Sequence, residues 1–191
     1  MLKFAAFFRK RPDLSHAQFQ RYWLERHAEV VLRLPGLARY VQNHPLPATL
    51  PPSSPCHGVA EVWLEDAGAL DRNPADPYWE EVGEDEARFI DQASLVVLPV
   101  AETAPKSGEW PRPGIKVLRT LSAMDGKVPP VAVLPTVRRY LRNGVTSGEG
   151  FCRGYDCTWF NSLADAHAVA AKMKDPAAMH VMIATEHVIK A

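Results

Sequence analysis

Apolar residues in the first hundred positions fall into four short runs, a pattern that predicts β-strands. The runs are residues 2–9, 37–44, 59–64 and 93–100. One segment with helix signals follows the first run, and another precedes the fourth. The resulting order, β-α-β-β-α-β, predicts an α+β fold built on a ferredoxin-like unit.

Both predicted helices begin at residues that favour helix starts. Ser15 and Gln18 have the spacing of a capping box, in which each side chain bonds the backbone N–H of the other. Asp76 caps the second helix, with Pro77 at its first position, and that helix runs towards residue 90. Pro35-Gly36 ends the first helix, whose apolar face is expected to carry Phe19, Tyr22, Trp23, His27, Val30 and Leu34.

The second half of the chain repeats part of the first. Residues 34–43 recur as 134–143, with five of the ten positions identical. Residues 58–64 are echoed in the same order by 154–160. Self-similarity of this kind indicates an internal repeat.

The repeat predicts two related units, residues 1–100 and 114–191. The segment between them, 101–113, is rich in Pro, Gly, Lys and Glu, which suits an exposed linker. Only about ten residues separate the first two strands of the second unit, and Pro129-Pro130 forbids a regular helix there. We therefore expect the second unit to be a degenerate copy that lacks its first helix.

The remaining elements of the second unit follow from its own apolar runs. Its strands are expected over 115–122, 137–143, 155–160 and 187–190, and a helix capped by Ser162 is expected to run through Lys174. In the first unit, a proline-rich stretch over 45–55 is expected to be a long loop, because proline cannot donate to a central strand.

Composition narrows the classes of function. Lys plus Arg and Asp plus Glu each number 22, so the net charge is zero and neither nucleic acid nor a membrane is expected as a partner. No apolar run approaches the roughly 20 residues of a transmembrane helix, and the N-terminus has no secretory signal. Three cysteines are too few for a disulfide framework. We therefore expect a reduced, cytoplasmic protein.

Motifs for several large enzyme classes are absent from the sequence. It has no glycine-rich phosphate loop, no nucleophile elbow and no His-Glu-x-x-His motif. Kinases, nucleotide-dependent dehydrogenases, serine hydrolases and zinc proteases are therefore disfavoured. Cofactor-free proton transfer remains open, and no metal site is expected.

The first unit carries a string of residues that resembles the EthD family. The string reads Phe19-x-x-Tyr22-Trp23-x-x-x-His27-x-x-x-x-x-x-Leu34-Pro35-Gly36-Leu37-x-x-Tyr40-x-Gln42-Asn43-His44. The resemblance covers the whole first unit and, weakly, the second. It implies a dimeric α+β barrel, in which two ferredoxin-like sheets face each other around a cavity. Here the repeat predicts that one chain supplies both sheets as a fused pseudo-dimer.

The resemblance also implies roles for particular residues. Relatives include the ethyl tert-butyl ether degradation protein and methylmuconolactone methylisomerase, and most members carry no cofactor, so none is expected here. In the methylisomerase-like members a histidine and a tyrosine line the active site, at the positions of His27 and Tyr40. Neutral imidazole can act as a general base near pH 7, and a buried histidine bonded to a backbone carbonyl is the alternative role for His27. Those members also use a cysteine in strand three, and residues 59–63 hold none.

Alternation along the strand over 37–44 places Tyr40, Gln42 and His44 on one face. Three hydrogen-bonding groups on one face suit the lining of a wet cavity, and the alternative is a strand face near solvent or at a subunit interface. Gln42 and His44 are therefore substrate-binding candidates, together with Trp23 on the adjoining helix.

The strand over 59–64 adds two further substrate-binding candidates, Glu61 and Trp63, which we expect to face the cavity. A carboxylate between apolar residues is costly unless it is paired. Glu61 is therefore either functional or in a salt bridge with Arg39 or another cation.

Three more side chains are placed by the sequence near the same strands and helices. His57 stands at the mouth of strand three and is a further substrate-binding candidate. Tyr78 and Trp79 stand early in the second helix. They either cover a cavity for an apolar or aromatic ligand or serve as core or interface aromatics.

Two functions of different kinds follow. The first is a cofactor-independent isomerase, cyclase or lyase that binds a small hydrophobic or cyclic metabolite, with His27 moving a proton and Tyr40 orienting a carbonyl or lactone. The second is a non-catalytic protein that binds such a metabolite or assists a degradative oxygenase. A haem-binding barrel is a third, with His187 in the last strand or His167 on a helix as axial ligand; His180 is also placed on a helix. Finally, two copies of this chain, each a fused pseudo-dimer, are expected as a possible homodimer.

Overall fold

A computed structural model describes most of the chain, namely residues 1–50, 54–65, 77–106, 108, 114–124, 134–148, 150–173 and 178–191. The chain forms two compact units. Unit 1 consists of Met1–His44, Pro55–Val97 and Val188–Ala191, and unit 2 of Pro45–Ser54 and Leu98–His187. The architecture is α+β, as predicted.

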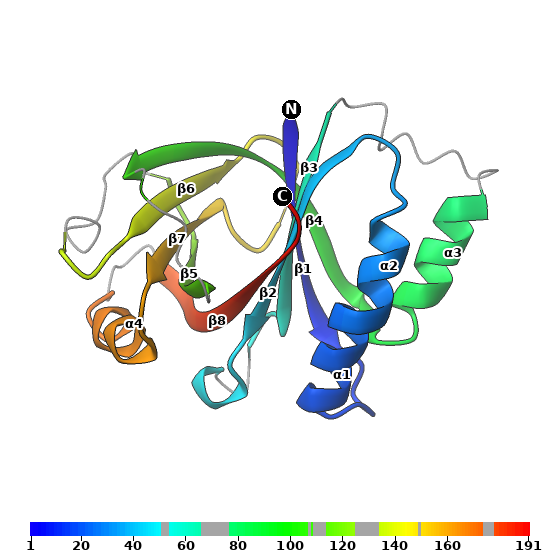
Figure 1. The fold of residues 1–191 in the computed structure, drawn as a ribbon, viewed down its shortest axis with the longest axis horizontal. Helices are drawn as coiled ribbons and strands as arrows, with labels where there is room; N and C mark the ends of the chain where they lie inside the picture. Colours follow the sequence, from blue (N-terminus) through cyan, green and yellow to red (C-terminus); the bar gives the residue numbers. More distant parts are fainter. Residues whose placement is uncertain are drawn as a thin grey trace. The chain divides into compact units, whose positions relative to one another are not determined.

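Unit 1 has the predicted ferredoxin-like order. Its elements are β1 (Leu2–Lys10), α1 (His16–Tyr22), η1 (Trp23–His27), α2 (Ala28–Val31), β2 (Leu37–Pro45), β3 (Gly58–Leu64), α3 (Pro77–Glu86) and the first part of β4 (Ile90–Lys106). The strands lie in the order β4-β1-β3-β2, with the end of β8 (Ala178–Lys190) beside β2. The helices stand together on one face of this sheet (Figure 1).

The first helix starts as the sequence predicts and then departs from it. The Ser15 side chain accepts from the Gln18 backbone, and the Gln18 side chain accepts from the Ser15 backbone, which confirms the capping box. From Trp23 to His27 the helix widens into a π-turn, where a regular α-helix was expected. Turns of this kind are rare in proteins, and those that occur are often found at functional sites.

Aromatic side chains fill the space between these helices and the sheet. Phe8 of β1 meets the ring of Trp23 edge-on, with ring centroids 4.9 Å apart. Phe19 and Phe89 pack against the same ring cluster, and all four side chains are buried. Edge-to-face packing of this kind stabilises a core beyond the burial of area alone.

Unit 2 repeats the strand order of unit 1. Its elements are the short 3₁₀-helix η2 (Pro47–Thr49), the second part of β4, β5 (Gly114–Leu121), β6 (Arg139–Val145), β7 (Gly154–Phe160), α4 (Leu163–Ala170) and β8. The strands lie in the order β8-β5-β7-β6, with β4 beside β6. Ser162 caps α4 as predicted, by accepting from the Asp165 backbone. No helix occurs in the described residues 122–124 and 134–138, between the first two strands of this unit.

The boundaries of β4, α4 and the last strand differ clearly from those predicted. The strand β4 continues to Lys106, so the start of the predicted linker is strand. Helix α4 ends at Ala170, four residues before the predicted end. The last strand begins at Ala178 and not at residue 187, so His180 lies on a strand and the prediction of a helix there was wrong. The reason is pairing: His180 lies opposite Thr120 of β5, and short apolar runs do not distinguish strand from helix by period.

The two units differ in chemistry at one equivalent pair of strand positions. In unit 1, Ala6 of β1 lies opposite Ala60 of β3. In unit 2, the same pair of positions holds Arg119 of β5 and Asp156 of β7. The guanidinium and the carboxylate form a buried salt bridge at 2.5 Å, and the Tyr140 hydroxyl donates to the same carboxylate at 3.0 Å. Small side chains thus leave space in unit 1 where an ion pair occupies it in unit 2.

The opposite face of each sheet repeats a second arrangement, a tryptophan ring between two cations. In unit 1 the Lys3 ammonium lies 4.4 Å and the Arg39 guanidinium 4.8 Å from the ring centroid of Trp63. In unit 2, Trp159 has the equivalent neighbours, Lys116 at 4.5 Å and Arg139 at 5.9 Å. Cation–π contacts of this kind are worth about 0.5–2 kcal/mol each.

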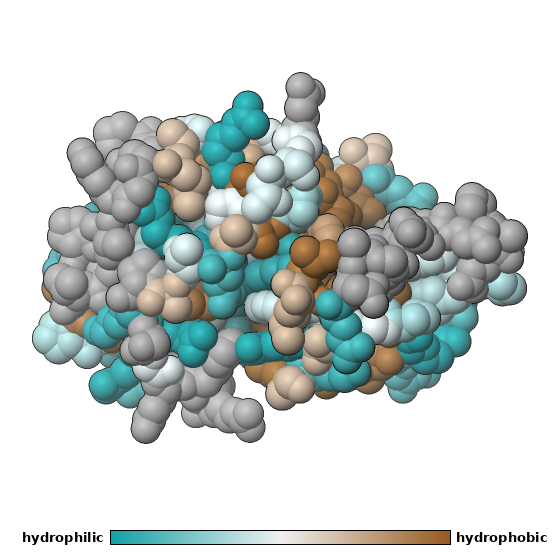
Figure 2. Space-filling view, turned by 90° about the horizontal axis from the view of Figure 1, so that it is seen from above, coloured by the Kyte–Doolittle hydropathy of each residue, from teal (hydrophilic) through white to brown (hydrophobic). Residues whose placement is uncertain are grey.

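Hydrophilic and hydrophobic residues are interspersed on the face shown in Figure 2. Among the described residues, the large hydrophobic side chains that are exposed are Met1, Leu2, Leu32, Val97, Leu163 and Met179. None of the described helices is long and apolar enough to cross a membrane.

The ion pair of unit 2 generates a prediction about stability. Asp156→Ala leaves the Arg119 guanidinium buried without its carboxylate, and breaking a buried pair typically costs about 3–5 kcal/mol. We expect a loss of that size in the unfolding free energy, measured by urea denaturation. Asp13→Ala, which breaks an exposed pair with Arg11, is the control and should change little. An Asp156 variant as stable as the control would contradict the prediction.

Candidate active site

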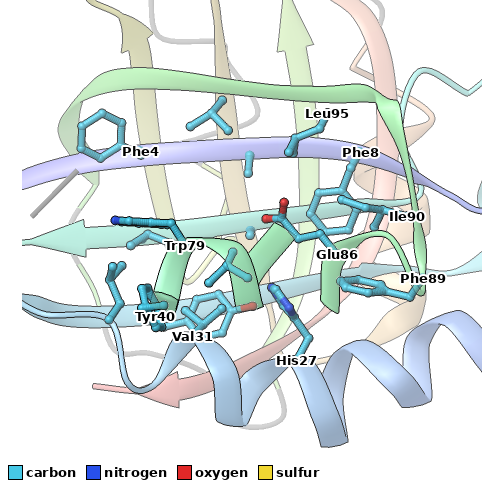
Figure 3. A pocket seen from close by; sticks show the side chains of 17 residues that line it. Phe4, Phe8, His27, Val31, Tyr40, Trp79, Glu86, Phe89, Ile90 and Leu95 are labelled. Carbon is cyan, nitrogen blue, oxygen red and sulfur yellow. The ribbon is translucent and has the colours of Figure 1, made fainter. Parts of the chain in front are cut away.

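A partly open cavity of about 110 Å³ lies between the helices and the sheet of unit 1. This is somewhat smaller than a cavity of about 150 Å³ that accommodates benzene. Most of its walls are apolar, and the side chains with polar groups come from η1, β2 and α3 (Figure 3). The lining residues are Phe4, Ala6, Phe8, His27, Val31, Leu34, Tyr40, Ala60, Val62, Tyr78, Trp79, Val82, Glu86, Phe89, Ile90, Leu95 and Val97.

His27 is held in the wall of this cavity by a carboxylate from another helix. Its Nδ1 lies 2.8 Å from Oδ2 of Asp85 in α3, and both side chains are buried. The other oxygen of Asp85 accepts a hydrogen bond from the Tyr22 hydroxyl at 2.6 Å. Burial raises the pKa of Asp85, but the hydrogen bonds from His27 and Tyr22 outweigh burial and hold it below its ordinary value.

This contact decides which ring nitrogen of His27 can act on a ligand. An ionised carboxylate only accepts hydrogen bonds, so Nδ1 carries the ring hydrogen and its N–H donates a hydrogen bond to Asp85. Nε2 is then the nitrogen left for the cavity, where it can accept a proton. The alternative predicted from sequence, a histidine bonded to a backbone carbonyl, is not what the structure shows.

Tyr40 supplies a hydrogen-bond donor in the same cavity. Its oxygen accepts from Trp23 Nε1 at 3.1 Å and from Gln42 Nε2 at 3.0 Å. Both partners are donors, so the hydroxyl hydrogen of Tyr40 is available to a ligand. Burial raises the pKa of Tyr40 well above its ordinary value, and the phenol therefore stays protonated.

Gln42 and His44 form a layer behind Tyr40 and are not among the residues that line the cavity. Gln42 Nε2 also donates to the Trp23 carbonyl at 2.9 Å, at the start of the π-turn. His44 Nε2 lies 2.9 Å from Gln42 Oε1, and its ring stacks on Trp23 with centroids 4.3 Å apart. The three predicted substrate-binding residues Trp23, Gln42 and His44 therefore fix the position of the Tyr40 hydroxyl.

Glu61 and Trp63 lie on the opposite face of the sheet from Tyr40. Tyr40 is opposite Val62 in the register, whereas Glu61 and Trp63 alternate with Val62 along β3. The Glu61 carboxylate pairs with the Lys3 ammonium at 2.7 Å, which confirms the predicted salt bridge to a neighbouring cation. The structure therefore does not bring these two candidates to the cavity of His27.

His57 is also outside the cavity, at the start of β3. Its Nδ1 accepts from the Lys10 backbone at 3.1 Å, and its ring meets that of His16 with centroids 4.9 Å apart. Burial, followed by the nearby His16 and Lys10, lowers the pKa of His57 to about 4. His167 on α4 and His187 on β8 belong to unit 2 and do not line the cavity either.

Helix α3 provides site residues that the sequence reasoning missed. Asp85 orients His27, and Glu86 lines the cavity. Tyr78 and Trp79 also line it, as one of their two predicted roles required. The available signal was helical spacing, because Tyr78, Val82 and Asp85 recur at the i, i+4, i+7 positions of one face.

The groups able to bind metal ions do not gather at this site. Within the described ranges, no three or more His, Cys, Asp or Glu side chains come together as a metal site would require.

Comparison with known families gives a match over unit 1. Residues 11–93 match the model of the EthD domain. The chain contains an EthD domain. The matched segment includes His27, Tyr40, Asp85 and Glu86. No curated protein matches the sequence.

Solved structures with very different sequences share the fold of this chain. An anthrone oxidase-like protein superposes with a TM-score of 0.64 at 8% identity, over 100% of this chain and 93% of that one. A candidate monooxygenase from Lactobacillus acidophilus NCFM gives 0.51 at 10% identity, with 99% and 94% covered. A mutant chlorite dismutase from Candidatus Nitrospira defluvii, in complex with cyanide, gives 0.54 at 11% identity, with 98% and 91% covered. These proteins are of the dimeric α+β barrel type, and at such identities they show the fold alone.

The Asp85–His27 contact predicts a pH dependence of stability. Because the pKa of folded Asp85 lies below the value of about 3.9 for an unfolded chain, ionised Asp85 stabilises the fold above about pH 4. That stabilisation is lost as the pH falls through the lower, folded pKa. The difference in unfolding free energy between wild type and Asp85→Asn should therefore shrink on acidification from about pH 6 to about pH 3. Asp91→Asn is the control, and an Asp85 difference that stays constant would refute the assignment.

A second prediction concerns His57. With a pKa of about 4, its ring should stay neutral from pH 8 to pH 5 in an NMR titration, where an ordinary histidine of pKa 6.5 becomes charged. Folding thus releases a proton at this site, and its contribution to stability falls as the pH drops from about 6.5 to about 4. The His57→Gln variant identifies the resonance. A His57 midpoint near pH 6.5 would contradict the lowering of its pKa by burial.

Proposed function

We propose that the EthD domain binds a small, mostly apolar compound with a carbonyl or phenolic oxygen and moves a proton on it. The observation that carries this proposal is the Asp85–His27 pair in the wall of a cavity that Tyr40 also lines. One group accepts a proton there and the other donates a hydrogen bond. Their combination suits proton abstraction next to a carbonyl group.

The step is balanced without any further reactant. His27 Nε2 takes a proton from the carbon next to the carbonyl, and the electron pair of that C–H bond moves onto the carbonyl oxygen. Tyr40 donates a hydrogen bond to the resulting enolate oxygen, while Asp85 stabilises the positive imidazolium. Return of the proton to a different carbon gives an isomer, and its return to the same carbon regenerates the substrate.

Two features of the cavity support this chemistry over simple storage of a hydrophobic compound. The Asp85 contact fixes the tautomer of His27, as carboxylates do in catalytic histidine pairs. Three residues behind Tyr40 fix its hydroxyl and leave the hydrogen for a ligand. A cavity that only bound an apolar molecule would need neither the fixed tautomer of His27 nor the fixed hydroxyl of Tyr40.

Several expectations from the sequence stay predictions. They are the origin of the two units as a fused pseudo-dimer, the pairing of two chains, a role in catabolism and a cytoplasmic location. A haem ligand from His167 or His187 has no support at the EthD cavity, because neither residue lines it.

The proposed proton transfer can be tested without knowing the natural substrate. The probe is cyclohexanone in D₂O, whose exchange of hydrogen next to the carbonyl is followed by NMR. Wild-type protein should accelerate exchange, His27→Ala should lose about 10²–10⁴-fold, and Tyr40→Phe about 10²–10³-fold. The control His167→Gln changes an exposed histidine of unit 2 and should leave the rate unchanged.

The outcome separates catalysis from binding. Circular dichroism of each variant checks that it is folded. If cyclohexanone binds, as seen by ligand-observed NMR, but its exchange is not accelerated, the domain is a binding protein and the catalytic proposal fails. A rate that His27→Ala does not change would equally exclude His27 as the base.

A further inference from the structure

The Tyr22 hydroxyl is the second partner of the carboxylate that orients His27. It donates to Oδ1 of Asp85 at 2.6 Å, while Oδ2 of the same carboxylate lies 2.8 Å from His27 Nδ1. Burial and the hydrogen bond to Asp85 raise the pKa of Tyr22, and a smaller effect of Arg88 opposes them. The phenol therefore stays protonated at neutral pH and remains a hydrogen-bond donor.

A neighbouring carboxylate has two opposing effects on a histidine that acts as a base. It fixes the tautomer of the ring, but its negative charge also favours the protonated imidazole. A protonated ring has no lone pair with which to accept another proton. Asp85 without a further partner would therefore orient His27 and at the same time reduce the neutral fraction of its ring near pH 7.

The hydrogen bond from Tyr22 weakens the second of these effects. Its length falls within the range of about 2.5–2.7 Å that is typical of a hydroxyl bonded to an ionised carboxylate. The phenol then balances part of the carboxylate charge, and less of that charge is left to stabilise a protonated His27. The orienting bond between Nδ1 and Oδ2 is retained, because the two donors use different oxygens.

Packing holds the Tyr22 ring in place independently of its hydroxyl. The ring stacks on Phe89, with centroids 5.4 Å apart. Tyr22 is not one of the described residues that line the cavity. Tyr22→Phe thus removes the hydroxyl, keeps the ring and leaves the described lining unchanged.

The other ionisable side chains around the pair differ from Tyr22 in exposure or position. Those on the surrounding helices and turns that are exposed are Glu25, Arg26, Arg33, Glu81 and Arg88. Those that line the cavity together with His27 are Tyr40, Tyr78 and Glu86. Water and salt screen the exposed charges. Arg88 is the exposed group that also interacts with the Tyr22 hydroxyl, and it therefore serves as a control.

We infer that Tyr22 is a positioning residue for the base: by sharing the Asp85 carboxylate, it keeps the His27 ring neutral to a lower pH than Asp85 alone would allow. The inference rests on the proposed function, because that function gives His27 its use as a base. The charge of the His27 ring can nevertheless be measured without any ligand.

The test is an NMR titration of the His27 ring in full-length protein from about pH 9 to about pH 5, with His27→Gln to identify its resonances. Tyr22→Phe should raise the midpoint of His27 by at least about 0.5 pH unit, because the carboxylate then acts on His27 alone. In an Asp85→Asn background the same substitution should change the midpoint by less than about 0.2 pH unit.

Arg88→Gln is the matched control, since it removes an exposed charge and leaves the Tyr22 hydroxyl in place. It should move the His27 midpoint by less than half as much as Tyr22→Phe. An unchanged midpoint in Tyr22→Phe overturns the inference. So does an equal change with and without the Asp85 carboxylate, or a full change in Arg88→Gln.

Exchange of cyclohexanone tests the proposed function separately. If wild type does not accelerate exchange but the midpoint moves as expected, the proton transfer fails and the effect of Tyr22 on His27 stands. If wild type does accelerate it, the pH at which the exchange rate falls on acidification should rise in Tyr22→Phe together with the midpoint. A profile that stays in place while exchange continues would contradict the role of Tyr22 in positioning the base.

Discussion

The hydrogen bond between Asp85 and His27 joins two helices that lie far apart in the chain, and the chemistry of the cavity depends on it. A carboxylate buried in this place would be costly alone. It is stabilised because the imidazole and the Tyr22 hydroxyl donate to its two oxygens. The same contact leaves a defined nitrogen of His27 for a ligand. One interaction therefore serves both the packing of α3 against the first helix and the orientation of the candidate base.

The π-turn places both aromatic and polar partners of this arrangement. It begins at Trp23, whose indole donates to Tyr40 and whose carbonyl accepts from Gln42. It ends at His27. A carbonyl that a side chain bonds within a helix is a known cause of local irregularity. The helix is thus irregular at the turn that carries His27 and that positions Tyr40 through Trp23.

Local signals were sufficient to predict much of the fold. The capping box at Ser15 depends on four consecutive residues, and the strand order follows from apolar runs and a familiar topology. His27 and Tyr40 were identified through a family motif, and both line the cavity. Asp85 was missed, because its role depends on a contact across 58 positions of the sequence. Glu61 shares a face of β3 with Trp63, as alternation predicted, but the cavity of His27 lies on the other face, where β3 meets the helices.

The contrast between Ala6–Ala60 and Arg119–Asp156 has a consequence for how the two units tolerate change. In unit 1, a longer side chain at either alanine would take up ligand volume, so each position is constrained separately and by size. In unit 2, either member of the ion pair is costly without the other, so the two positions are constrained jointly and by charge. Among relatives with this arrangement, covariation is therefore expected between positions 119 and 156, whereas positions 6 and 60 should show independent conservation of small residues.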